Sequence, residues 1–75
     1  MESTMSALMR AVVLETQEDA LLVRDCRTRQ NVLVHTDSAG EFRPCDCVCI
    51  HYSGAMTMSI PPQISADEIH CLRRG

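Results

Sequence analysis

Apolar and polar residues alternate with a period of two over most of this 75-residue chain, and short polar segments interrupt the alternation. A period of two is typical of strands whose two faces meet different surroundings. Polar or broken segments at 17–19, 28–30 and 37–45 separate the alternating stretches. The pattern predicts strands at 7–16, 20–27, 31–36, 46–52 and 68–73, a short extended piece at 55–59, an irregular segment at 60–66 and a loose end at 1–5.

The order of these strands is that of a small barrel of the OB type, in which a meander of three strands is followed by a long connection and two more strands. The helix that usually joins the third and fourth strands is not expected, because 37–45 is short and contains Gly40 and Pro44. We therefore predict an all-β fold, a five- to six-stranded OB-like barrel without the usual helix. The whole of 1–75 is predicted to form this single domain.

Alternation within each predicted strand divides the apolar residues between two faces. The inner face is predicted to hold Val12, Leu14, Leu21, Val23, Val32, Val34, Val48, Ile50 and Tyr52. The opposite face carries a second apolar set, formed by Met9, Ala11, Val13, Leu22 and Leu33. Such an outer apolar stripe predicts self-association as a homodimer with two-fold symmetry. The alternative explanation is that the two faces are assigned the wrong way round, or that the N-terminus covers the stripe.

The composition supports a folded domain and bears on its partners. Apolar residues make up 45% of the chain, but only Phe42 and Tyr52 are aromatic. The formal net charge is −3, and all seven basic residues are arginine. Proteins that bind single strands combine a basic groove with aromatic stacking platforms, so nucleic acid is not an expected partner. Single-stranded nucleic-acid binding stays open as an alternative function, because OB-folds often perform it.

The sequence shows no targeting or membrane segment. Glu2 stands where a signal peptide would carry positive charge, and no apolar run approaches the ~20 residues of a membrane span. The five cysteines are an odd number, which prevents complete pairing within one chain and indicates reduced thiols. We therefore expect a cytoplasmic protein with no membrane partner.

The run formed by Cys45, Cys47 and Cys49 is the candidate for metal or thiol chemistry. Zinc needs about four thiolate or imidazole ligands that converge tetrahedrally, whereas alternate residues of a strand project in parallel about 6.5 Å apart. Small side chains on the outer face of a strand are the simpler explanation. We predict no metal, no cofactor and no catalytic residue, and a thiol- or metal-handling protein remains an alternative. The additional ligands considered for the run are Cys26, Cys71, His35, His51 and His70.

A Tyr-x-Gly turn at Tyr52 and Gly54 is followed by a Ser-x-Pro-x-Gln-Ile segment that runs from Ser59 to Ile64. With these motifs, residues 12–72 resemble a group of small bacterial OB-like domains of unknown function. The relatives usually carry glycine before the aspartate that opens the fourth strand, and this chain has Cys45 there. The resemblance implies the fold and implies no activity.

The proline segment after the Tyr-x-Gly turn has two interpretations. Two prolines fix the backbone and remove two donors, so the segment suits a stiff strap that closes one end of the barrel. The same rigidity suits a preorganised recognition loop. The candidate binding residues are Tyr52, Ser59, Pro61, Pro62 and Gln63. We predict a non-enzymatic binding or assembly module whose protein partner is left open.

Overall fold

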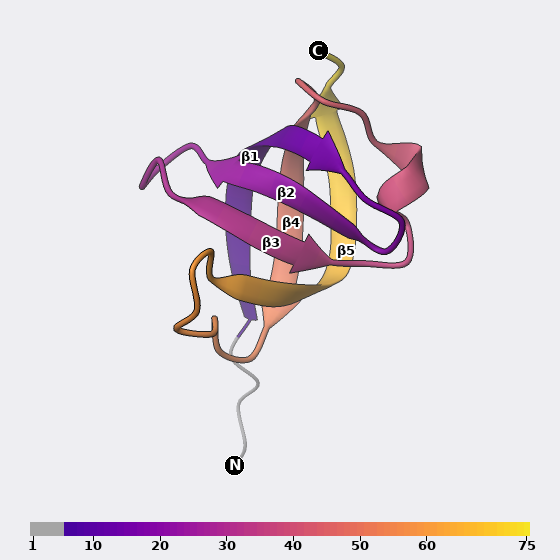
Figure 1. Ribbon diagram of the computed structural model, residues 1–75. Coiled ribbons are helices and arrows are strands. Elements are labelled where there is room, and N and C mark those ends of the chain that lie inside the picture. Colours follow the sequence, from indigo (N-terminus) through magenta and orange to yellow (C-terminus); the bar gives the residue numbers. More distant parts are fainter. Residues whose placement is uncertain (1–5) are drawn as a thin grey trace.

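The computed structural model describes residues 6–75 and shows an all-β barrel (Figure 1). Its elements are the strands β1 (Ser6–Thr16), β2 (Ala20–Asp25), β3 (Asn31–His35), β4 (Cys47–Ser53) and β5 (Gln63–Arg73), with the 3-10 helix η1 (Ala39–Glu41) between β3 and β4. The predicted fold class is therefore confirmed, and one short turn of helix replaces the usual helix. The expectation of a loose end at 1–5 lies outside the described residues. Among residues 6–75, no helix has the length and apolar character that a membrane crossing requires.

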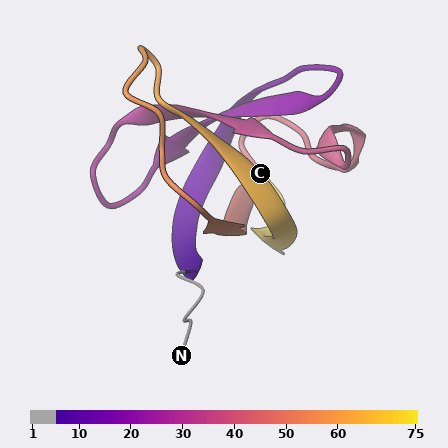
Figure 2. The same cartoon turned by 90° about the horizontal axis from the view of Figure 1, so that it is seen from below.

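The five strands form a closed ring in the order β1-β2-β3-β5-β4. All neighbouring strands are antiparallel except β3 and β5, which run parallel. The long strand β1 belongs to both halves of the ring, since its first part pairs with β4 and its last part pairs with β2. Figure 2, seen from below, shows how β1 crosses from one side of the barrel to the other. Ring closure leaves few unpaired strand edges, which suits a chain with so small a core.

The core fills the inside of this ring with aliphatic side chains. Six of the seven predicted inner positions of β2, β3 and β4 are confirmed, because all but Tyr52 are fully buried. Each such side chain contributes roughly 1.5–3 kcal/mol by leaving water. The buried apolar residues are Met9, Ala11, Val13, Ala20, Leu21, Val23, Val32, Val34, Ala39, Phe42, Val48, Ile50 and Ile64. Tyr52 is half-buried and packs against the edge of this core.

The predicted inner face of β1 is wrong. Val12 is half-buried and Leu14 is exposed, whereas Met9, Ala11 and Val13 are buried. Both faces of this strand are apolar, so alternation alone does not identify the inner one. The pairing with β2 also shifts at a bulge between Val13 and Glu15, which displaces the residues on either side of it.

The predicted outer apolar stripe is therefore not present on the surface of the barrel. Three of its five members, Met9, Ala11 and Val13, belong to the core, and the other two, Leu22 and Leu33, are half-buried. A surface that lies inside the barrel does not support a homodimer. The alternative explanation given for the stripe, a wrong assignment of the two faces, is the correct one for β1.

The strand β5 begins earlier than the pattern predicts. Residues 63–66 were expected to be irregular, but Leu33 pairs with Gln63, Val34 with Ile64 and His35 with Ser65. The partner strand is therefore some thirty residues away in sequence, and no local sequence pattern predicts this pairing. The predicted extended piece at 55–59 is not a strand, and β2 ends at Asp25 because a turn follows it.

Asp46 joins the loop after η1 to the end of the chain. Its carboxylate is buried and accepts hydrogen bonds from the Arg43 N–H at 3.0 Å, the Gly75 N–H at 3.1 Å and Arg74 Nη1 at 2.9 Å. The hydrogen bond from the Gly75 backbone, followed by that from Arg43, lowers the pKa of Asp46 below its ordinary value. The charged form is therefore favoured by folding.

Asp46 is expected to make the folded barrel sensitive to acid. Because its pKa is lowered in the folded state, its contribution to stability is complete above the ordinary carboxyl pKa and is lost as the pH falls through the lowered value. Melting curves recorded from pH 7 down to about pH 3 should show a steeper loss for the parent than for Asp46→Asn. The matched change Glu18→Gln, at an exposed turn, should leave the parent's profile unchanged. Equal acid sensitivity in the parent and Asp46→Asn would contradict this assignment.

Cys45 occupies a backbone conformation that favours glycine. Its φ is 78°, and its N–H donates to the Val13 carbonyl at 2.7 Å, which anchors the turn that leads into β4. A residue with a Cβ atom loses about 1–2 kcal/mol of stability in this left-handed region. Replacement by glycine would remove that loss, but glycine also increases the entropy of the unfolded chain, which offsets part of the gain. Glycine adopts a positive φ without this steric cost, so the geometry favours glycine at this position.

Replacing Cys45 with glycine should therefore stabilise the fold. We expect Cys45→Gly to raise the free energy of unfolding by about 0.5–1 kcal/mol, because it relieves the positive φ while removing only an exposed side chain. Cys45→Ser retains the Cβ and should give no gain. Urea unfolding of the three proteins measures the difference, and a gain shared by Ser and Gly would show that loss of the thiol is responsible.

Candidate binding groove

The loop at 54–62 is held by its own hydrogen bonds rather than by sheet pairing. Gly54 opens it with a φ of 87°, as expected for the glycine of the Tyr-x-Gly turn. At its base, the Thr57 N–H donates to the Gln63 carbonyl at 3.0 Å, and the Gln63 N–H donates to Thr57 Oγ1 at 2.9 Å. These two bonds fix where β5 begins.

The proline segment is both fastened to the barrel and exposed at its tip. The Ser59 hydroxyl donates to the Pro61 carbonyl at 2.9 Å, and Thr57 Oγ1 lies 2.7 Å from Ser59 Oγ. Pro62 is buried, and its carbonyl accepts the Leu33 N–H at 2.9 Å. Ile60 is 99% exposed. The position of Pro62 fits the strap interpretation, whereas Ile60 at the tip of the loop is exposed to solvent.

Gln63 has a structural position. Its Oε1 lies 2.8 Å from His35 Nε2, within hydrogen-bonding distance, so its side chain joins β5 to β3. The sequence analysis named Gln63 as a candidate binding residue. In the structure it stands beside the parallel pairing of the two strands and lines neither of the hollows described next.

Two hollows flank the β2–β3 turn at 26–30. The first lies between this turn and the proline segment and is lined by Leu22, Arg29, Gln30, Asn31, Ser59, Ile60, Pro61 and Pro62. The second lies between the turn, the first part of β1 and Met56, and is lined by Leu8, Met9, Arg10, Asp25, Cys26, Arg27, Thr28, Gln30, Cys49, Tyr52 and Met56. Gln30 belongs to both. We refer to the two hollows and the turn between them as the groove.

The turn inside the groove is ordered by its own contacts. The Arg29 N–H donates to the Asp25 carbonyl at 2.7 Å, and the Asp25 N–H donates to the Gln30 carbonyl at 2.9 Å. The Asp25 carboxylate accepts the Arg27 N–H at 2.8 Å. Arg27 and Arg29 therefore project from a fixed backbone, and their side chains are exposed.

The groove combines cationic and apolar surface. Arg10 reaches it from β1, and Arg27 and Arg29 reach it from the turn. Exposed Leu8 and Ile60 and half-buried Met56 supply apolar contacts. Guanidinium groups suit phosphate, and apolar side chains suit the faces of bases or of other planar groups. Figures 1 and 2 both place the orange 54–62 loop and the β2–β3 turn on the same side of the barrel.

The structure brings most of the predicted binding residues to this groove. Ser59, Pro61 and Pro62 line the first hollow and Tyr52 lines the second, whereas Gln63 lies outside both. Sequence reasoning missed the arginines, because Arg10 comes from β1 and Arg27 and Arg29 come from the β2–β3 turn, so that they look scattered along the chain. The available signal for this part of the groove was the polar turn at 28–30, which the sequence pattern placed between the second and third strands.

The cysteine run does not lie on one strand. Cys45 precedes β4, which begins at Cys47 and not at the predicted residue 46. Cys47 and Cys49 alternate with buried Val48 and Ile50, which places them on the outer face as expected. The run therefore presents two neighbouring thiols rather than three.

Comparison with known proteins supports the fold. No protein-family model matches the chain, and no curated protein matches it. Crystal structures of the mitochondrial single-stranded DNA-binding protein Rim1 from S. cerevisiae match over 99% of this chain and 100% of theirs. The TM-scores are 0.67 and, for selenomethionine-labelled crystals, 0.66, each at 13% identity. Such a likeness shows the OB-type fold and supports the bacterial OB-domain resemblance at that level only.

The comparison also corrects one expectation. Net charge and the scarcity of aromatic residues led us not to expect nucleic acid as a partner. Rim1, whose crystal structures match the fold over 99% of this chain, is a single-stranded DNA-binding protein. The two compositional criteria therefore do not exclude this class of ligand.

The two roles of the proline segment predict different effects of substitution on the free energy of unfolding. Pro62→Ala should lower the free energy of unfolding by about 1–2 kcal/mol, because it removes buried atoms and frees the unfolded backbone. Ile60→Ala should stay within about 0.5 kcal/mol of the parent, since that side chain is exposed. Chemical denaturation measures both. A large loss for Ile60→Ala would show that the tip packs against the barrel.

Proposed function

We propose that this chain is a non-enzymatic OB-fold module that binds single-stranded nucleic acid in the groove. The observation that carries the proposal is the coincidence of two facts. Rim1, which matches the fold over 99% of the chain, is a single-stranded DNA-binding protein, and the groove lies beside β2, β3 and the β4–β5 loop, where OB-folds bind oligonucleotides.

The distribution of charge supports this proposal better than its total. Three acidic residues lie far from the β2–β3 turn. Glu18 and Asp19 precede β2 and Asp37 follows β3, so they are at the ends of these strands opposite to the turn (Figures 1 and 2). The six residues of β2 span about 20 Å, which is more than twice the screening length of about 8 Å at physiological salt. Repulsion from these acidic groups is therefore weak at the groove, where three arginines face one aspartate.

The apolar residues determine what kind of binding is expected. Tyr52 is the one aromatic residue that lines the groove, so stacking is limited and Met56 and Ile60 supply further contact. Phosphate contacts of arginine carry no sequence information. We therefore expect weak, sequence-tolerant binding with a Kd of about 10⁻⁶ to 10⁻⁴ M.

The non-enzymatic part of the proposal rests on the sequence, which contains no nucleophile elbow, P-loop or dinucleotide fingerprint. The assembly role considered from the sequence depended on the outer stripe and loses its basis with that stripe. Nucleic-acid binding is the alternative that the fold favours.

Fluorescence anisotropy with labelled single-stranded oligonucleotides of about 8–16 nucleotides tests the proposal. Three arginine–phosphate contacts predict a slope of log Kobs against log salt of about −2. The double variant Arg27→Glu/Arg29→Glu should abolish measurable binding at 150 mM salt, because two cations become anions.

The matched control is Arg73→Glu, which makes the same kind of charge change at the far end of β5, away from the groove. It should reduce binding little. Absence of binding by the parent at low salt, or an equal loss for each single charge reversal at positions 29 and 73, would overturn the proposal.

A further inference from the structure

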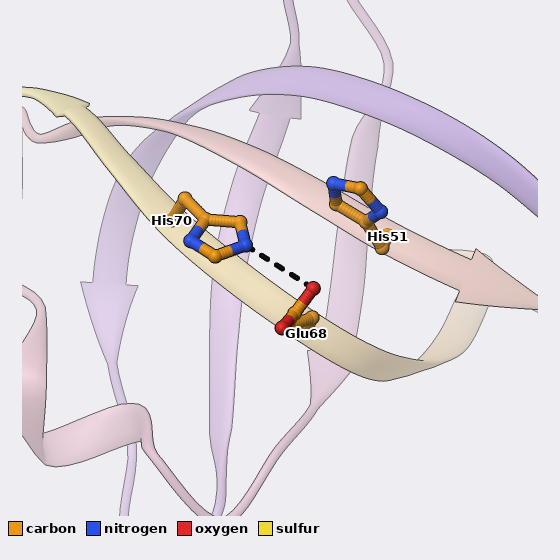
Figure 3. Close-up of side chains that lie close together, drawn as sticks. All are labelled: His51, Glu68 and His70. Atoms are coloured by element: carbon orange, nitrogen blue, oxygen red, sulfur yellow. Dashed lines mark ion pairs between the residues drawn. The ribbon is translucent and has the colours of Figure 1, made fainter.

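A cluster of three potential metal ligands lies on the outer face of the barrel, formed by His51, Glu68 and His70 (Figure 3). One ligand atom from each residue lies within 4.8 Å of the other two. His70 Nε2 is 3.2 Å from Glu68 Oε1, and the rings of His51 and His70 meet edge to face with centroids 5.5 Å apart. Two imidazoles and one carboxylate thus converge on one point of the surface.

The backbone of two paired strands holds this cluster. His51 on β4 is directly opposite Glu68 on β5, and His70 follows Glu68 by two residues on the same face. Opposite and same-face neighbours in a sheet have their Cβ atoms close enough for side-chain contact. The cluster therefore depends on the register of β4 with β5, and it needs no loop to fold around an ion.

The ligand types indicate zinc or a similar divalent transition ion. Zinc binds imidazole nitrogen and carboxylate oxygen at about 2.0–2.2 Å, and a set of two histidines and one glutamate is one of its usual combinations. Tetrahedral ligands at that distance lie about 3.4 Å from one another, close to the spacing of His70 and Glu68. His51 is half-buried, and Glu68 and His70 are exposed, so small rotations of two surface side chains complete the approach.

Hard cations are a poorer match for the same cluster. Calcium takes six to eight oxygen ligands, and magnesium prefers carboxylates and water, whereas this cluster has one carboxylate. The sequence analysis considered these histidines only as additions to the cysteine run. The structure places them with Glu68 instead, which follows His51 by 17 positions along the chain.

We propose that His51, Glu68 and His70 form a binding site for one divalent transition-metal ion, with zinc as the best match. Water would complete the fourth position, because the three protein ligands leave one tetrahedral position open. A bound ion would tie β4 to β5 at a point outside the groove, so the site is independent of the proposed nucleic-acid binding. Its consequence is a zinc-dependent gain in the stability of the ring.

Isothermal titration of the reduced full chain with zinc chloride tests the site. We expect one ion per chain, and His51→Ala, Glu68→Gln and His70→Ala should each weaken binding by about tenfold or more, since each removes one of three protein ligands. Zinc should also raise the melting temperature of the parent by several degrees, because an ion that binds only the folded chain stabilises it. That rise should be absent in His70→Ala.

The matched control is His35→Ala, which removes an exposed histidine outside the cluster and should retain zinc binding. The double variant Cys45→Ser/Cys47→Ser should retain it too. Circular dichroism without zinc checks that each variant folds, and Glu68→Gln and His70→Ala, at exposed positions, carry the test if His51→Ala does not fold. No binding by the parent, or binding that survives the cluster variants but is lost with the cysteines or His35, would overturn the proposal.

Discussion

The parallel pairing of β3 with β5 is the constraint on which the barrel depends, because it converts an open antiparallel sheet into a closed ring. Only three residue pairs make this contact, from Leu33–Gln63 to His35–Ser65. Parallel strands need a long crossover, and here the chain passes through η1, β4 and the 54–62 loop before it returns. The backbone bond from Leu33 to the Pro62 carbonyl and the Gln63–His35 contact extend the pairing at its edge. The proline segment therefore completes the closure.

The same segment explains why a small barrel offers a groove at this place. Pro62 is buried and cannot move without loss of closure, whereas Ile60, two residues earlier, is exposed. A chain that is fixed at its base and free at its tip presents side chains with little ordering cost on binding. The β2–β3 turn faces it with a backbone that is equally fixed, through the contacts of Asp25 with Arg27 and Arg29. Closure of the barrel and the proposed binding thus depend on one segment, with Pro62 at its fixed base and Ile60 at its exposed tip.

Local patterns predicted the elements well and their distant partners poorly. Alternation in β2, β3 and β4 identified the buried positions, because one face of each strand is clearly more apolar. It failed in β1, where both faces are apolar and a bulge shifts the register after Val13. It also missed the start of β5, whose first pairs are with a strand some thirty residues earlier. The proline residues of the groove were found from their rigidity, but Arg10, Arg27 and Arg29 converge only through the fold.

The difference between the net charge of the chain and the local charge at the groove also arises from the fold, because the arginines of the groove converge only when the strands pair. A net charge of −3 is a property of the composition, but a ligand responds to charges within about a screening length of its own position. The strand β2 separates the acidic turn at 17–19 from the β2–β3 turn by its own length, and the pairing of β1 with β2 brings Arg10 to the same side as the arginines of that turn. The pairing of β4 with β5 likewise brings His51 to Glu68 and His70, which sequence spacing does not relate. In a barrel this small, each strand contributes to the core on one face and to the surface on the other, so the register that buries Val48 and Ile50 also determines which polar groups meet outside.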